Sequence, residues 1–173
     1  MQEKEAPMRA THRPVLVAFG LVVLASAAQA AGTVKVSYVQ PEAFADIGIA
    51  GHDRESNLQQ LSKHFEILAT RYLADGQTLS VEVLDVDLAG TMKPVRRGGQ
   101  DFRVLKGAAD WPRVTLRYTL QAAGSPSRSG EAKLADLGYL QNVDSVRSRE
   151  PLYSERRMLD KWFAAQFGPA SDR

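Results

Sequence analysis

The sequence predicts an α+β domain with two layers, in which two helices cover an antiparallel or mixed sheet of about five strands. Segments with the two-residue period of strands occur together with two long segments that have the period of a helix. The predicted order is β-α-β-β-β-β-α, with short turns between consecutive strands. This arrangement is typical of a sheet covered by helices on one face.

The N-terminal half of the domain is predicted to contain a strand, a helix and a second strand. Residues 33–39 alternate apolar and polar side chains, as in a half-buried strand. A helix is predicted from caps at His52 and Asp53 to Gly76, because its apolar residues recur at spacings of three, four and one. Residues 77–88 are apolar at both parities, so this strand is predicted to be central and buried on both faces.

The C-terminal half is predicted to add three strands and a helix. The three strand-like segments are residues 101–105, 111–121 and 131–137. The second of these alternates most regularly, and its polar face is expected to meet solvent. A turn is predicted at residues 96–99 and a loop at 123–130. Pro151 opens the last helix, residues 152–167, and Gly168 stops it.

Residues 1–30 have the features of a cleaved signal peptide. Arg9 and Arg13 precede an apolar run at residues 15–24, and Ala28-Gln29-Ala30 fits the A-x-A cleavage pattern. The run is shorter than the roughly 20 apolar residues that span a membrane. No arginine pair precedes it, so we expect export to the periplasm through the general secretory route.

The mature chain is predicted to form one domain at residues 31–168 with a disordered tail at 169–173. Cleavage removes three of the 22 cations and two of the 20 anions, so the formal net charge falls from +2 to +1. This balance argues against a nucleic-acid partner. The absence of cysteine excludes disulfides and a lipid-bearing cysteine, so no membrane anchor is expected after cleavage. Met8 is an alternative to Met1 as the first residue.

The strongest candidate for chemistry is Asp85 with Asp87, near the end of the second strand. On a strand the two carboxylates point to the same face about 7 Å apart, close enough to share a divalent cation or a substrate hydroxyl. The segment superficially resembles a calcium loop. It fails as one, because position 5 is Ala89 and position 12 is Arg96, where a bidentate Glu is required.

A structural role is the alternative for these two aspartates, through pairing with Arg103 or Arg113 and through backbone N–H groups at the turn. Asp46 and Asp136 join the pair if the loop after the first strand and the end of the last strand meet at one sheet edge. The candidate polar cluster has five members: Asp46, Asp85, Asp87, Arg113 and Asp136. Four carboxylates in one place would need a cation or raised pKa values.

Other catalytic motifs are missing from the sequence. There is no G-x-S-x-G elbow, and Gly98-Gly99 lacks the Lys-Ser/Thr of a phosphate loop. His64 lies beside the apolar stripe of the first helix, where we expect a partly buried, hydrogen-bonded histidine. We therefore expect neither a cofactor nor a bound metal.

Two further groups have an ordinary interpretation and a functional one. Four aromatic residues could line a groove but are more typical of a core, and they are Trp111, Tyr139, Tyr153 and Trp162. Four cations could form a basic sheet face for an anionic partner but are more typical of a solvated face, and they are Arg103, Arg113, Arg117 and Lys133.

Several phrases spread over the mature chain carry a family resemblance. They are residues 41–46 (PEAFAD), 85–90 (DVDLAG), 111–113 (WPR), 136–139 (DLGY), 155–159 (ERRML) and 162–163 (WF). Together they resemble a proteobacterial family of exported proteins known as domain-of-unknown-function family 3016. The resemblance implies no known activity, and it transfers no catalytic residue.

Two functions follow as expectations. The first is a non-enzymatic module of the cell envelope that binds a ligand or a partner, such as an envelope protein or a cell-wall component. The second is a carboxylate-based or metal-dependent hydrolase centred on Asp85 and Asp87. Carboxylates that converge in an open pocket would favour the hydrolase. Carboxylates that are each bound to an arginine or to a backbone turn would favour the module.

Overall fold

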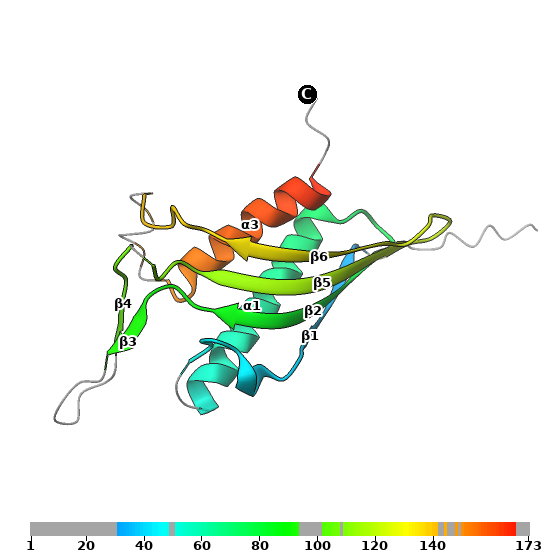
Figure 1. Cartoon of the computed structure of the whole chain (residues 1–173). Coiled ribbons are helices and arrows are strands. Elements are labelled where there is room, and N and C mark those ends of the chain that lie inside the picture. Colours follow the sequence, from blue (N-terminus) through cyan, green and yellow to red (C-terminus); the bar gives the residue numbers. More distant parts are fainter. Residues whose placement is uncertain are drawn as a thin grey trace, which may run out of the picture.

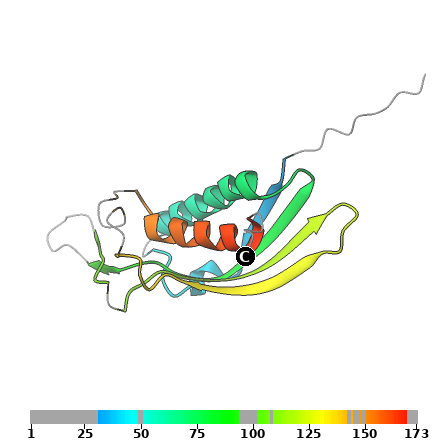
Figure 2. The same cartoon turned by 90° about the horizontal axis from the view of Figure 1, so that it is seen from above.

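Two helices lie on one face of a twisted mixed sheet, and no described helix or strand covers the other face, here called the open face, as Figure 1 and Figure 2 show. The computed structural model describes residues 31–48, 51–93, 102–107, 109–141, 144, 148 and 150–168. The predicted signal peptide, the turn at residues 96–99 and the tail at 169–173 lie outside the described residues. The α+β class and the two helices are confirmed.

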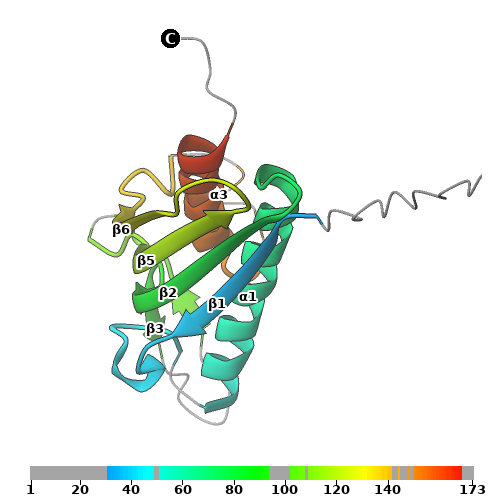
Figure 3. The same cartoon turned by 90° about the vertical axis from the view of Figure 1, so that its right-hand side faces the viewer.

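The main sheet has four strands in the order β1-β2-β5-β6, and a separate pair is formed by β3 and β4. Their bounds are β1 Thr33–Tyr38, β2 Gln77–Asp87, β3 Thr91–Lys93, β4 Phe102–Val104, β5 Arg113–Ala122 and β6 Arg128–Ala135. β1 runs parallel to β2, and the other neighbours are antiparallel (Figure 3). The short strand predicted at residues 101–105 does not join the main sheet, because it pairs with β3, which the sequence analysis did not identify.

The helices α1 (Gly51–Tyr72) and α3 (Tyr153–Phe167) supply the second layer. The helix α1 begins at Gly51, so the predicted caps His52 and Asp53 lie inside its first turn, where the carboxylate of Asp53 faces the positive end of the helix dipole. The turn η1 (Pro41–Ala43) follows β1. The core lies between the helices and one face of the sheet.

A β-bulge in β2 overturns the prediction that this strand is buried on both faces. The register against β5 shifts between Val83 and Asp85, so one extra residue, Leu84, is inserted in β2. Before the bulge the odd-numbered residues face the core, and after it the even-numbered ones do, which puts Val86 in the same core as Val83. Apolar residues of both parities therefore point to one face, and β2 is central in the sheet as predicted.

The strand β6 begins at Arg128, three residues before the predicted start, because Gly130 belongs to the strand and not to the loop. Gly130 is paired with Tyr118 across the two strands. A Cβ at Gly130 would lie 2.8–2.9 Å from the phenol of Tyr118. Glycine here marks a close approach of two strands, as it does elsewhere inside strands.

Two of the four aromatic residues considered above are core residues. Tyr139 is buried, and Trp162 on α3 is buried against the sheet, so the core interpretation is confirmed for both. Tyr153 and Trp111 are half-buried at the end of the sheet that carries β3 and β4. The rings of Tyr118 and Phe163 lie 5.5 and 5.0 Å from that of Trp162 in edge-to-face contact.

Candidate functional site

Asp85 and Asp87 lie on the open face of the sheet, where they alternate with the buried Val86. Asp85 accepts a hydrogen bond from the backbone N–H of Ala45 at 2.9 Å. Asp87 accepts two hydrogen bonds from Arg113, at 3.0 Å from Nε and 2.6 Å from Nη2. The two carboxylates share a face, and each has its own partner.

The guanidinium of Arg113 is held between Asp87 and an aromatic ring. Its central carbon lies 5.4 Å from the centre of the Trp111 ring, within the range of a cation–π contact. The Arg113 side chain is 46% exposed, so solvent weakens its ion pair with Asp87. This arrangement fixes the position of the two side chains more than it stabilises the fold.

Asp46 lies beside Asp87 through an isolated parallel bridge, which continues the line of β1 after the turn η1. Its carboxylate points to a different cation, because Arg103 donates to both of its oxygens at 2.8 and 3.1 Å. The same guanidinium donates to the backbone oxygens of Ala89 and Gly90. Arg103 thereby attaches β4 to the end of β2, and it is not part of an exposed basic face.

Asp136 is separated from the other carboxylates by the sheet itself. It follows β6, and its carboxylate accepts a hydrogen bond at 2.7 Å from Lys161 on α3, the helix that covers the opposite face. The structure therefore brings Asp46, Asp85, Asp87 and Arg113 together at the end of β2 and leaves Asp136 apart. Among the described residues, no group of three or more acidic or histidine side chains is arranged to hold a metal ion.

Glu155 is a buried carboxylate to which the sequence analysis assigned no role. It lies near the start of α3, only 3% of it is exposed, and it accepts the backbone N–H of Ala89 at 2.7 Å. Burial raises the pKa of Glu155, while that hydrogen bond, its own backbone N–H and the nearby Arg103 act in the opposite direction. A cavity of about 330 Å³ adjoins Glu155, Arg103 and Tyr153.

His64 on α1 is buried and bonded to residues of α3, so the expectation of a buried, hydrogen-bonded histidine is confirmed. Its Nε2 lies 3.1 Å from the backbone oxygen of Arg156 and 2.9 Å from Oδ1 of Asp160. Because a backbone oxygen only accepts, Nε2 carries the proton. Burial is the main cause that lowers the pKa of His64. The buried Nδ1 has no hydrogen-bond partner among the described residues.

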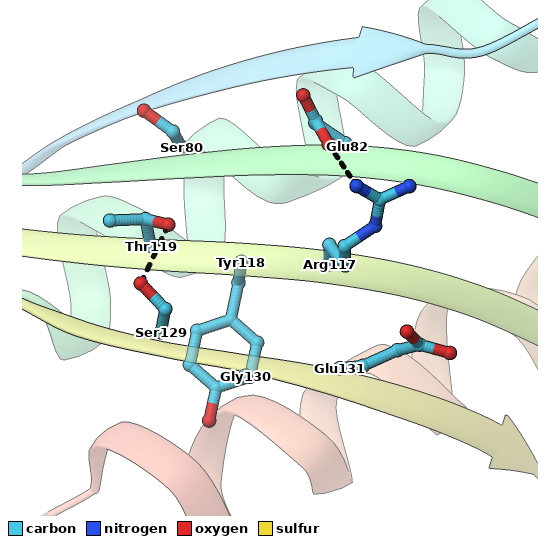
Figure 4. A pocket seen from close by; sticks show the side chains of 8 residues that line it. All are labelled: Ser80, Glu82, Arg117, Tyr118, Thr119, Ser129, Gly130 and Glu131. Atoms are coloured by element: carbon cyan, nitrogen blue, oxygen red, sulfur yellow. Dashed lines mark hydrogen bonds and ion pairs between the residues drawn. The ribbon is translucent and has the colours of Figure 1, made fainter.

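A groove of about 430 Å³ lies on the open face across β2, β5 and β6, and Figure 4 shows its lining. Two rows of side chains cross the strands there. The first is the hydroxyl row Ser80–Thr119–Ser129, and the second is the charged row Glu82–Arg117–Glu131. Thr119 and Ser129 share a hydrogen bond of 3.0 Å, and Arg117 lies 3.5 Å from Glu82.

The lining of the groove is held loosely, in contrast to the carboxylates at the end of β2. Arg117 and Glu82 are 57% and 52% exposed. Glu131 is exposed and has no hydrogen bond or ion pair within the described part of the chain. Tyr118 points to the opposite side, over Gly130 and toward α3 (Figure 4). The groove therefore offers polar groups that can change partners at little cost.

One comparison identifies the family of the chain. The model of the family described as "Protein of unknown function (DUF3016)" matches residues 32–165, which span the domain from β1 into α3. The chain is a member of the DUF3016 family. No curated protein and no solved structure matches it significantly. The family description assigns no activity.

Of the features of this DUF3016 domain that were not predicted, the buried Glu155 has a signal in the sequence and the groove has none. Glu155 interrupts an apolar helix face, since it lies three residues after Leu152 and four before Leu159. An acidic residue at such a position indicates a buried carboxylate. The rows of the groove require the register between strands, which the sequence does not supply.

In the described part of the chain, no helix is both long and apolar enough to span a membrane.

Proposed function

We propose that this DUF3016 protein is a non-enzymatic binding module of the bacterial cell envelope, and that it binds its ligand on the open face of the sheet. The observation that carries the proposal is the groove with its hydroxyl row and its charged row. The alternative, a hydrolase centred on Asp85 and Asp87, is less well supported, because both carboxylates already have a partner.

The chemistry of the groove favours a ligand that is rich in hydroxyl groups and carries no net charge. Ser80, Thr119 and Ser129 each donate and accept hydrogen bonds, as sugar hydroxyls do. In the other row, the cation of Arg117 lies between the carboxylates of Glu82 and Glu131. Lys35, paired with Ser80 on the neighbouring strand, adds a second exposed cation beside the groove, so the two carboxylates and two cations carry no net charge. Glycan chains of the cell wall have this chemistry.

Titration with soluble, uncharged oligosaccharide fragments of cell-wall glycan tests this proposal. We expect changes in the NMR signals of Ser80, Thr119 and Ser129. Thr119→Val removes the central hydroxyl and leaves the shape of the side chain nearly unchanged, and Arg117→Ala removes the cation. Each substitution should weaken binding by about tenfold, which is the effect of roughly one hydrogen bond. Lys63→Ala on the exposed side of α1 is the matched control and should leave binding unchanged. Binding that survives both groove substitutions would place the ligand elsewhere.

Export to the periplasm is a separate part of the proposal, and it rests on residues 1–30. If signal peptidase cleaves after Ala30, the mature protein begins at Ala31. The intact mass of the protein recovered from the periplasmic fraction should match residues 31–173. A mass that retains the apolar run at residues 15–24 would show that this segment is not removed.

A further inference from the structure

The strand β6 is an edge of the main sheet, and no described strand pairs with its outer side. It is eight residues long, contains no proline and pairs with β5 in an unbroken register from Arg128 to Ala135. An edge of this kind presents unpaired backbone N–H and C=O groups to another strand. The opposite edge is β1, which is six residues long.

The backbone groups that face outward from β6 follow from its pairing with β5. The N–H of Asp136 donates to the backbone oxygen of Pro112, which continues the register of the pair Ala135 and Arg113. In an antiparallel ladder, hydrogen-bonded residues alternate with residues that bond on the other side. The even-numbered residues of β6 therefore bond to β5, and the odd-numbered ones present their N–H and C=O groups to the free edge. These are Ser129, Glu131, Lys133 and Ala135.

The charges of β6 are antisymmetric about Ala132, because Glu131 precedes it and Lys133 follows it. If β6 of a second copy lies antiparallel with Ala132 opposite Ala132, Glu131 of each copy is opposite Lys133 of the other. In this register Ser129 is opposite Ala135, so all the outward-facing residues meet as hydrogen-bonded pairs. Other registers centred on a neighbouring residue place Glu131 or Lys133 opposite itself, and like charges directly opposite are destabilising.

We propose that two copies of this chain associate through their β6 strands, centred on Ala132, to form one continuous sheet of eight strands. Within the described residues, Glu131 and Lys133 have no other ion-pair partner, and both are exposed on the open face. β1 carries a single charged residue, Lys35, and so offers no such self-complementarity. In the dimer, the two open faces lie on the same side, and the two grooves are neighbours across the paired β6 strands.

Charge substitution at the edge tests the dimer. Sedimentation equilibrium of the purified protein should show a reversible monomer–dimer equilibrium. Glu131→Lys places lysine opposite lysine at two points and should raise the dimer dissociation constant about tenfold or more. The double variant Glu131→Lys, Lys133→Glu restores both pairs and should restore the dimer. Circular dichroism checks that each variant is folded.

A single introduced cysteine tests the register, and the chain has no cysteine to interfere. In the proposed dimer Ala132 is opposite itself in a non-hydrogen-bonded pair, where the Cα atoms are about 4.5 Å apart, within the range of a disulfide. Ala132→Cys should therefore cross-link on mild oxidation. Ser129→Cys is the matched control, because its two copies lie six residues apart along the strands, about 20 Å. A protein that stays monomeric at all concentrations would overturn the proposal. So would a dimer whose dissociation constant is unchanged in Glu131→Lys, or one in which Ala132→Cys cross-links no better than Ser129→Cys.

Discussion

The two faces of the main sheet are built on different principles. On the covered face, Leu79, Leu116 and Phe163 are completely buried. The ring of Phe163 packs against those of Phe65 and Trp162 in tilted and edge-to-face contacts. On the open face, Arg117 and Glu82 are more than half exposed and form a loose pair. The covered face therefore determines whether the chain folds, and the open face can vary with little effect on stability. Such freedom is what a recognition surface needs.

The largest expected effect is on the covered face, at Trp162. Only 9% of this residue is exposed, and its ring contacts the rings of Tyr118, Phe163 and Phe167. Trp162→Ala should lower the free energy of unfolding by about 3–5 kcal/mol, because it removes buried area and leaves a cavity. Urea unfolding measures the change. Leu137→Ala is the control, since Leu137 is 64% exposed, and it should change stability by less than about 0.5 kcal/mol.

Substitutions at Gly130 and Ser129, which are adjacent in β6, allow a direct comparison of the two faces. A Cβ at Gly130 would collide with Tyr118 on the covered side, so Gly130→Ala should destabilise the domain by about 1–3 kcal/mol. Ser129→Ala, one residue earlier and on the open face, should change stability by less than about 0.5 kcal/mol. Thermal unfolding of both variants would sharpen the contrast. Equal losses at the two positions would contradict the account of the close approach.

The buried Glu155 should make the unfolding free energy of the domain depend on pH. Its pKa is raised in the folded state above the ordinary value of 4.5, so the folded protein binds this proton more tightly than the unfolded chain does. The resulting stabilisation is fully present below pH 4.5 and is lost as the pH rises through the folded pKa. Glu155→Gln keeps the acceptor for Ala89 and cannot ionise. The unfolding free energy of the variant relative to wild type should therefore rise between pH 4 and pH 8, and a constant difference would show that Glu155 ionises as easily as in water.

The ion pair on the open face should contribute little to stability. Arg117 and Glu82 are 3.5 Å apart and largely exposed, and such pairs contribute about 0–1 kcal/mol. Glu82→Gln should thus shift the urea midpoint only slightly, and this shift should shrink further at high salt. A large loss of stability would mean that the charged row is a structural element and not a free surface.

No shift is expected when divalent cations are added. Asp85 and Asp87 already accept hydrogen bonds from Ala45 and Arg113, so magnesium, calcium, manganese or zinc should leave the melting temperature unchanged. A cation bound at a hundredfold excess over its dissociation constant would stabilise the native state by about 2.7 kcal/mol. A shift of that size, absent from the Asp85→Asn, Asp87→Asn double variant, would favour the hydrolase hypothesis over the binding module.

The sequence predicted the positions of the helices and strands better than it predicted which of their side chains face the core. Periodicity was sufficient for α3 and for the alternating strand β5, because in both the apolar positions repeat regularly. It was misleading for β2, where the inserted Leu84 changes which parity faces the core. The short strand β4 was predicted within residues 101–105, but β3 and its pairing with β4 were missed, because a three-residue strand contains too few positions to show a period.

The carboxylate cluster at the end of β2 was predictable in its members and less so in its arrangement, whereas the groove was not predicted, because its rows depend on the register between strands. The pairing of Asp87 with Arg113 follows from adjacent strands and was among the alternatives considered. The separation of Asp136 depends on which face it occupies, and Lys161 of α3, which binds it, is 25 residues further along the chain. Such contacts between distant segments arise from the packing of the layers, which a single sequence does not encode locally.

The bulge in β2 has a consequence for how the chain tolerates changes in length. Val83 and Asp85 are paired with consecutive residues of β5, Leu116 and Thr115, so Leu84 has no position of its own in the ladder. Deletion of Leu84 would leave every cross-strand pair in place and would produce a straighter strand. A deletion before the bulge that draws Leu84 into the ladder would instead turn the residues between the deleted position and the bulge to the other face, as any one-residue slip does. The strand can therefore lose one residue at the bulge itself without turning the aspartates into the core.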